Sequence, residues 1–89
     1  MNRQEIKDIV YNKLKAIFID ENEIEVLLSK YPNDGEDLLL YNEIELDSLD
    51  ILTFIIELEK EFNINIDDDI FNKDCKLKDI INYIYERKK

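Results

Sequence analysis

Histidine is absent from this chain of 89 residues, and cysteine, glycine and proline occur once each. The lone Cys75 cannot form an internal disulfide, and without histidine it indicates neither a zinc site nor a Cys-His catalytic pair. A single glycine and a single proline leave few positions that interrupt a helix. No apolar run approaches the roughly 20 residues that span a membrane, and the first residues do not open a secretory signal. Stable membrane insertion is therefore not expected, and a cytoplasmic location is the default.

Acidic residues outnumber basic residues in this chain. The 22 acidic and 12 basic residues give a net charge of −10. Residues 20–72 hold 17 of the acidic side chains but only Lys30 and Lys60 as basic ones. Such a segment repels nucleic-acid phosphates and anionic lipid, and it attracts proteins with basic docking patches. The alternative is that the acidity only maintains solubility.

Length and hydrophobic periodicity predict one all-α domain over residues 1–89. A chain of this size supports a single small core, and a hydrophobic content of 45% argues against disorder. Apolar residues recur at helical spacing in residues 2–18, 48–62 and 76–88. Asp20 and Asn22 can cap a shorter segment that runs to residue 30. The expected architecture is a four-helix bundle with a long connection between the first helix and the helix that starts at Ser48.

The segments between these helices are predicted to be loops. The clearest break is residues 31–35, which contain both Pro32 and Gly35. Residues 63–66 alternate like a strand but are short, so an extended loop is expected there, followed by a helical turn at 68–72. Five apolar side chains of the loops are expected to reach the core: Leu38, Leu40, Ile44, Ile64 and Ile66.

The helix from residue 48 to 62 carries two apolar faces. At about 100° per residue, five large side chains share one broad face: Ile51, Phe54, Ile55, Leu58 and Phe62. Leu49, Leu52 and Ile56 form a second stripe that begins beside Ser48. The core of a monomer does not need this stripe, which is therefore predicted to be a docking surface. The alternative is that the connection of residues 20–46 folds over it.

Ser48 stands at the entrance of this helix, between Asp47 and Leu49. A serine at this position usually caps the helix by accepting a backbone hydrogen bond. The surrounding sequence is more specific: residues 44–50 read IELDSLD, residues 58–66 read LEKEFNINI and residues 77–84 read LKDIINYI. Together these segments resemble the acyl carrier protein family, in which the serine of an Asp-Ser-Leu motif carries a phosphopantetheine arm.

The resemblance implies a carrier and not an enzyme. A phosphopantetheinyl transferase would attach 4'-phosphopantetheine from coenzyme A to Ser48, and the transferase would supply the metal and the base. The thiol of the arm would hold acyl intermediates as thioesters between acyl-loading and acyl-processing enzymes of fatty acid, polyketide or related specialised biosynthesis. A helix N-terminus suits the new phosphate group, because its backbone N–H groups and dipole favour negative charge. The chain is expected to be a monomer.

Six side chains around the serine are candidates for contact with these enzymes: Asp47, Leu49, Asp50, Leu52, Ile56 and Glu59. Asp47 either contacts the transferase or is simply the N-cap of the helix. Three residues depart from the family pattern, because Glu45 replaces a usual glycine, and Thr53 and Lys60 replace acidic residues that many fatty-acid carriers have. Residues 19–37 are longer than the matching loop of a minimal fatty-acid carrier, which indicates a specialised pathway.

Other functional classes are weaker. A hydrolase built on Ser48 would lack a histidine base. Asp67, Asp68 and Asp69 lack the ligand spacing, the central glycine and the final glutamate of an EF-hand calcium loop, so a helix N-cap is the better interpretation. The serious alternative is an unmodified acidic docking or adaptor domain that retains the carrier fold.

Overall fold

The computed structural model describes residues 1–18 and 20–88. In chain order its elements are α1 (Arg3–Lys15), α2 (Glu21–Ser29), the 3₁₀ helix η1 (Pro32–Gly35), α3 (Ser48–Phe62), the 3₁₀ helix η2 (Asp68–Ile70) and α4 (Leu77–Lys88). Over these residues no β-sheet forms, and one isolated bridge joins Leu39 to Lys76. The all-α prediction is confirmed. None of the helices in this part of the chain has the length and apolar character needed to cross a membrane.

Local hydrogen bonds set where the first two helices begin. The Asn2 side chain accepts from the Glu5 N–H at 2.8 Å, and the Glu5 carboxylate accepts from the Asn2 N–H at 3.1 Å, which starts α1. The Asp20 carboxylate accepts from the Asn22 N–H at 3.0 Å, so Asp20 is the cap of α2. α1 ends at Lys15, earlier than the predicted end at residue 18.

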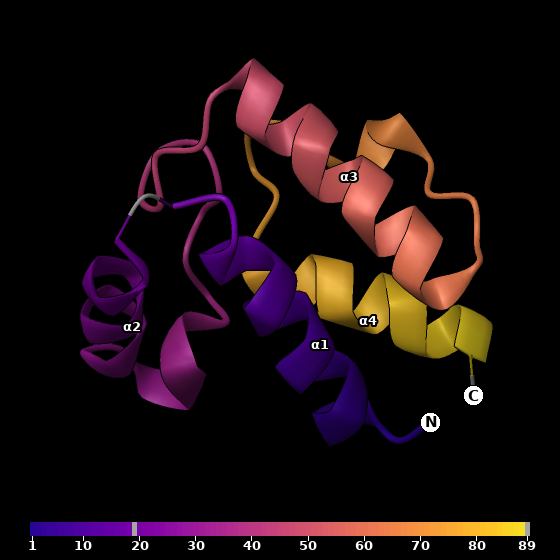
Figure 1. Cartoon of the computed structure of the whole chain (residues 1–89), viewed down its shortest axis with the longest axis horizontal. Helices are drawn as coiled ribbons and strands as arrows, with labels where there is room; N and C mark the ends of the chain where they lie inside the picture. Colours follow the sequence, from indigo (N-terminus) through magenta and orange to yellow (C-terminus); the bar gives the residue numbers. More distant parts are fainter. Residues whose placement is uncertain (19, 89) are drawn as a thin grey trace.

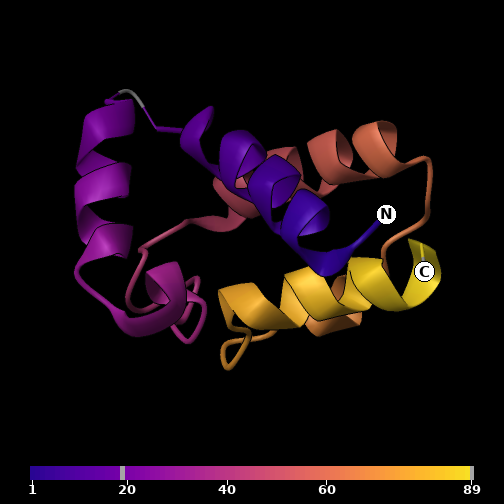
Figure 2. The same ribbon diagram turned by 90° about the horizontal axis from the view of Figure 1, so that it is seen from below.

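Three of the helices form the body of the bundle, and α2 stands at one end of it (Figures 1 and 2). α1 packs against α4, α3 and α2, and η1 packs against α2. The two chain ends lie near each other, away from α2 (Figure 1). The long predicted connection between α1 and α3 therefore contains a helix of its own.

Apolar side chains from all four helices close one core. α3 contributes the face that its periodicity predicted, since its buried residues are Ile51, Phe54, Ile55, Leu58 and Phe62. Of the five loop side chains expected in the core, four are buried: Leu38, Leu40, Ile44 and Ile66. Ile64 is only partly buried against the core, so that part of the prediction is wrong. Asn63, which has a left-handed backbone (φ 53°), ends α3 directly before Ile64.

The connection before α3 is held to the start of α4 by backbone hydrogen bonds. The Leu40 N–H donates to the Cys75 carbonyl at 3.0 Å, and the Leu77 N–H donates to the Leu38 carbonyl at 3.1 Å. Cys75 is buried, and burial raises the pKa of its thiol to about 12, which keeps it protonated and unreactive. These bonds anchor the connection without forming a sheet.

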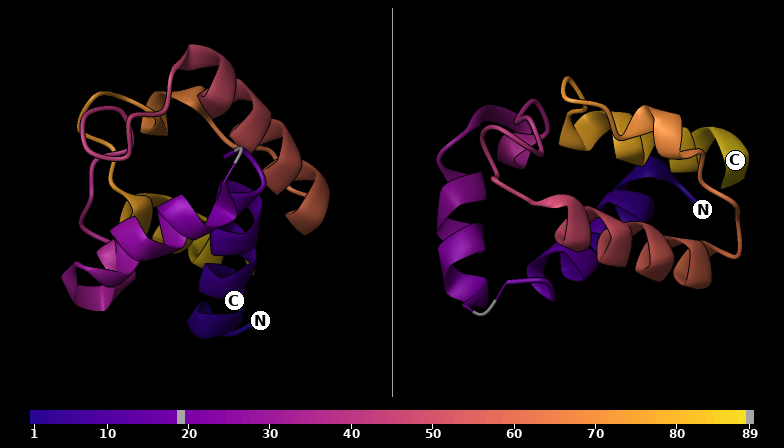
Figure 3. Two further views of the ribbon diagram at one scale, coloured as in Figure 1. Left: turned by 60° about the vertical axis from the view of Figure 1, so that its left-hand side comes forward. Right: turned by 90° about the horizontal axis from the view of Figure 1, so that it is seen from above.

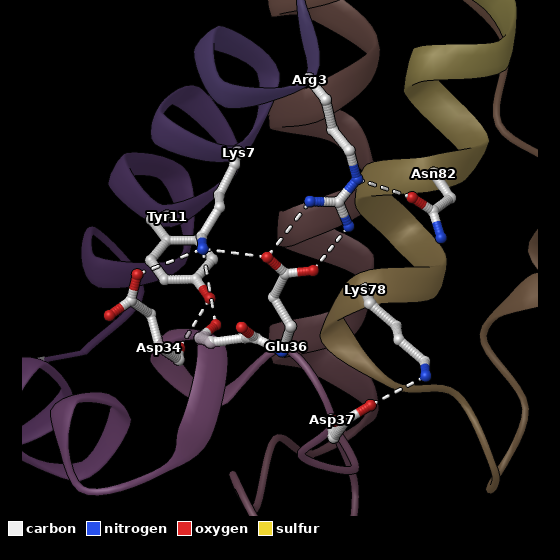
Figure 4. A network of polar contacts seen from close by, with 9 residues as sticks. Arg3, Lys7, Tyr11, Asp34, Glu36, Asp37, Lys78 and Asn82 are labelled. Atoms are coloured by element: carbon white, nitrogen blue, oxygen red, sulfur yellow. Dashed lines mark hydrogen bonds and ion pairs between the residues drawn. The ribbon is translucent and has the colours of Figure 1, made fainter.

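A buried carboxylate joins α1, this connection and α4 (Figure 4). The Arg3 guanidinium donates to both oxygens of Glu36, at 2.5 and 3.2 Å, and Lys7 Nζ lies 2.9 Å from the same carboxylate. Arg3 also donates to the Asn82 side chain on α4 at 2.9 Å. The hydrogen bond from Arg3, aided by Lys7, holds the pKa of Glu36 below its ordinary value despite desolvation. Glu36 is therefore ionised and paired at neutral pH.

Candidate functional site

The entrance of α3 is built by two aspartates. The Asp47 carboxylate accepts from the Asp50 N–H at 2.8 Å, and the Asp50 carboxylate accepts from the Asp47 N–H at 3.3 Å. This reciprocal pair is a capping box that satisfies backbone donors at the helix start. Asp47 is thus the N-cap, one of the two roles predicted for it. The expectation that Ser48 caps the helix is wrong, because Ser48 is the first residue inside α3.

Ser48 presents its hydroxyl to solvent. The residue is exposed, and within residues 1–18 and 20–88 its Oγ has no hydrogen-bond partner. The other serine, Ser29, differs because its Oγ donates to the Val26 carbonyl at 2.9 Å near the end of α2. Only Ser48 combines a free hydroxyl with a helix N-terminus, where backbone N–H groups favour an attached phosphate. The site therefore fits a phosphodiester-linked group.

Glu45 occupies a left-handed position in the turn before Ser48. Its φ is 66°, a conformation that glycine adopts without steric cost. Its neighbours Ile44 and Leu46 are each 3% exposed, and the Leu46 N–H donates to the Leu40 carbonyl at 3.0 Å. Because both neighbours are anchored in the core, Glu45 is held in this conformation with its side chain in solvent.

The second apolar stripe of α3 is open to solvent. Leu49 is 70% exposed, Leu52 53% and Ile56 42%. The alternative in which the connection of residues 20–46 covers the stripe is wrong, because that connection packs against α1 and the start of α4. A contiguous row of large apolar side chains thus begins beside the Ser48 hydroxyl and follows one side of α3.

The remaining predicted contact residue, Glu59, has an internal role. Its carboxylate accepts from the Ile66 N–H at 3.0 Å and so ties the loop after α3 back onto the helix. Sequence periodicity did not reveal this bond, since the donor lies in a loop beyond the helix end. The other five candidates lie at the start and along one side of α3, where all but the half-buried Asp50 are exposed: Asp47, Leu49, Asp50, Leu52 and Ile56.

The acidic turn at residues 67–69 is a cap. The Asp67 carboxylate accepts from the Asp69 N–H at 3.0 Å and starts η2, as the cap interpretation predicted. In the part of the chain that the structure describes, no group of three or more histidine, cysteine, aspartate or glutamate side chains could hold a metal ion. The candidate site therefore consists of the α3 entrance and its exposed stripe.

Comparison with known proteins places this chain in a family. Residues 12–84 match the family model described as a phosphopantetheine attachment site. The chain is 31% identical to the acyl carrier protein of Lactobacillus acidophilus over 75 residues, which cover 84% of this chain and 88% of that protein. It is 29% identical to the acyl carrier protein of Campylobacter jejuni strain RM1221 over 79 residues, covering 89% of this chain and 96% of that protein.

No solved structure matches the chain. The family match spans α2, the connection and α3, so the helix between α1 and α3 lies inside the carrier domain. Members of this family carry 4'-phosphopantetheine covalently and are not themselves enzymes. On the match over residues 12–84 and the identity to these relatives, the chain belongs to the acyl carrier protein family.

Proposed function

We propose that Ser48 is the residue that carries 4'-phosphopantetheine. In the reaction the Ser48 oxygen bonds to the phosphorus next to the pantetheine unit of coenzyme A. The pyrophosphate bond breaks, adenosine 3',5'-bisphosphate leaves, and the serine proton passes to a base of the transferase. The observation that carries the proposal is the free, exposed Ser48 hydroxyl at the N-terminus of α3, beside an open apolar stripe.

The role of this chain in the reaction is to present the hydroxyl. The capping box of Asp47 and Asp50 fixes the first turn of α3 and leaves Ser48 pointing outward. A fixed first turn keeps backbone N–H groups directed at the new phosphodiester, which favours its negative charge. When bound, the arm supplies a thiol that holds acyl groups as thioesters.

The exposed stripe is the proposed contact for the transferase and for enzymes that load or process the acyl group. Leu49, Leu52 and Ile56 offer apolar anchors, and Asp47 and Asp50 place negative charge next to them. An apolar strip edged by charge suits a partner whose apolar pocket has a basic rim. The acyl cargo belongs to fatty acid, polyketide or related specialised biosynthesis.

Mass spectrometry tests the attachment directly. Wild type incubated with coenzyme A and a broad-specificity phosphopantetheinyl transferase should gain one phosphopantetheine group, and Ser48→Ala should gain none. Ser29→Ala is the matched control and should be modified like wild type. Modification of folded Ser48→Ala would contradict the assignment. An unmodified wild type with several active transferases would favour an unmodified docking or adaptor domain instead.

A further inference from the structure

A groove separates α2 from the loop that leads to Ser48. It has a volume of about 570 Å³ and lies between one side of α2, from Asp20 to Lys30, and residues 43–45. Figure 3 shows α2 at the end of the bundle beside this connection. Its apolar lining is Val26, Leu27 and Ile44, and Val26 is 53% exposed. The groove is distinct from the exposed stripe of α3, which contributes no residue to its lining.

Four acidic side chains surround the apolar lining: Asp20, Glu23, Glu43 and Glu45. All four are exposed, and Lys30 is the one basic residue that lines the groove. In the described part of the chain none of these four carboxylates forms an ion pair. The groove is therefore an apolar surface with a net negative rim, in which, over the described residues, Asp20 and Glu43 accept only backbone hydrogen bonds.

Several carboxylates elsewhere form ion pairs with cations of α1 and α4. Arg3 and Lys7 pair with Glu36, and Lys78 lies 2.8 Å from Asp37. Lys15 lies 2.7 Å from Glu25, which is on α2 but not part of the groove. These cations of α1 and α4 thus pair with other carboxylates, and among the described residues Lys30 is the one basic residue that lines the groove. A basic partner gains more from the unpaired rim than from carboxylates that are already paired.

The groove is continuous with the attachment site along the chain. Glu45 lines it and lies three residues before Ser48. Three residues span at most about 11 Å, so a protein held in the groove also reaches the entrance of α3. α2 forms the other wall of the groove and lies within residues 19–37, which the sequence predicts to be longer than in a minimal carrier.

We propose that this groove docks a basic segment of a partner protein, one in which an apolar side chain flanked by lysine or arginine enters between Val26 and Ile44. The apolar side chain covers the exposed Val26, and the flanking cations pair with Asp20, Glu23, Glu43 and Glu45. The identity of that partner, an enzyme acting on the group bound to Ser48, rests on the proposed function. The groove gives such an enzyme a second contact besides the α3 stripe.

A defined peptide tests the groove without knowledge of the partner. The probe is a synthetic peptide with two leucines flanked on each side by two lysines, added to the ¹⁵N-labelled full chain. Amide shifts should concentrate at residues 20–30 and 43–45, and binding should weaken as salt rises from about 0.05 to about 0.5 M, since the contacts are solvent-exposed. A peptide with glutamates in place of the lysines should not bind.

Matched variants decide whether the groove is responsible. Glu23→Lys with Glu45→Lys should weaken peptide binding about tenfold, because two ion pairs become repulsions. Asp68→Lys with Asp69→Lys changes the net charge equally but lies on η2, and it should alter binding by no more than about twofold. Val26→Ser should weaken binding without affecting the fold. Glu23→Gln with Glu45→Gln repeats the test if the lysine variant unfolds.

Three results would overturn the proposal. The first is that the groove variant and the η2 variant weaken peptide binding equally. The second is that the glutamate peptide binds as well as the lysine peptide. The third is that the amide shifts are confined to Leu49, Leu52 and Ile56. Mass spectrometry of Ser48 modification is run on the same samples. An unmodified wild type that still binds the peptide in the groove would reject the proposed carrier role and keep the docking site. A modified wild type that does not bind the peptide in the groove would reject the docking site and keep the proposed carrier role.

Discussion

The Asp47 carboxylate accepts a hydrogen bond from the Asp50 N–H at 2.8 Å, across the residue proposed to be modified. The helix cap and the proposed attachment site are therefore two adjacent residues and not one. Asp47 holds the helix start, and Ser48 keeps a free hydroxyl for chemistry. This division means that a group can be added to Ser48 without breaking the cap of α3.

Asp47 and Ser48 are expected to contribute differently to the stability of the fold. Asp47→Ala should lower the free energy of unfolding by about 1 kcal/mol, because it removes the cap. Ser48→Ala should change it by no more than about 0.5 kcal/mol, because the hydroxyl has no partner in the described part of the chain. Urea denaturation followed by circular dichroism measures both. Equal losses would show that Ser48 contributes to the cap.

Replacing Glu45 by glycine should stabilise the fold. Glu45 has φ of 66°, where a side chain adds steric cost, although glycine also loses more entropy on folding. A net gain of about 0.5–1 kcal/mol in the free energy of unfolding is expected. Asn42→Gly in the same connection is the control, because Asn42 has no positive φ and should not be stabilised. A loss of stability in Glu45→Gly would contradict this account of the turn.

Glu36→Gln should be among the more damaging single changes in the connection. The glutamate is 8% exposed and pairs with Arg3 and Lys7, so its neutral analogue leaves Arg3 without its counter-charge and Lys7 with Asp34 alone. We expect a loss of about 2–3 kcal/mol in the free energy of unfolding. Asp37→Asn removes an exposed pair with Lys78 and should cost clearly less. Thermal and urea unfolding of both variants test the difference.

The same carboxylate predicts a pH dependence. The pKa of Glu36 is lowered in the folded state by the hydrogen bond from Arg3, against an ordinary value of 4.5. A lowered pKa contributes stability that is fully present above the unfolded value and is lost as the pH falls through the folded value. The stability difference between wild type and Glu36→Gln should therefore be constant near neutral pH and shrink in acid. A difference that stays constant in acid would argue against the paired, ionised state.

Leu49→Ser tests the exposed stripe beside the proposed attachment residue. Since Leu49 is 70% exposed, the free energy of unfolding should change by no more than about 0.5 kcal/mol. The kcat/KM of transferase modification should fall about tenfold, because an apolar anchor is lost from the contact. Tyr31→Ser removes an exposed aromatic side chain, 43% exposed and located between α2 and η1, and should leave kcat/KM unchanged. If both variants change kcat/KM equally, the exposed stripe is not the contact for the transferase.

The sequence by itself determined the helices, the two apolar faces of α3 and the position of Ser48 at its entrance. These features depend on contacts between residues three or four apart, which a 3.6-residue period records directly. The buried face of α3 was correct residue by residue, from Ile51 to Phe62. The carrier motif around Ser48 was readable for the same reason, since it is contiguous along the chain.

Only the tertiary structure decided which surfaces stay open. It showed that the connection reaches α4 through Leu38 and Leu40 and so leaves Leu49 uncovered, and that Glu36 is buried against Arg3. It also placed α2 beside Glu45 to form the groove. Each of these relationships joins residues far apart in the sequence, and periodicity carries no information on such pairings. They depend on how the helices pack, because burial of one face determines which other face remains in solvent.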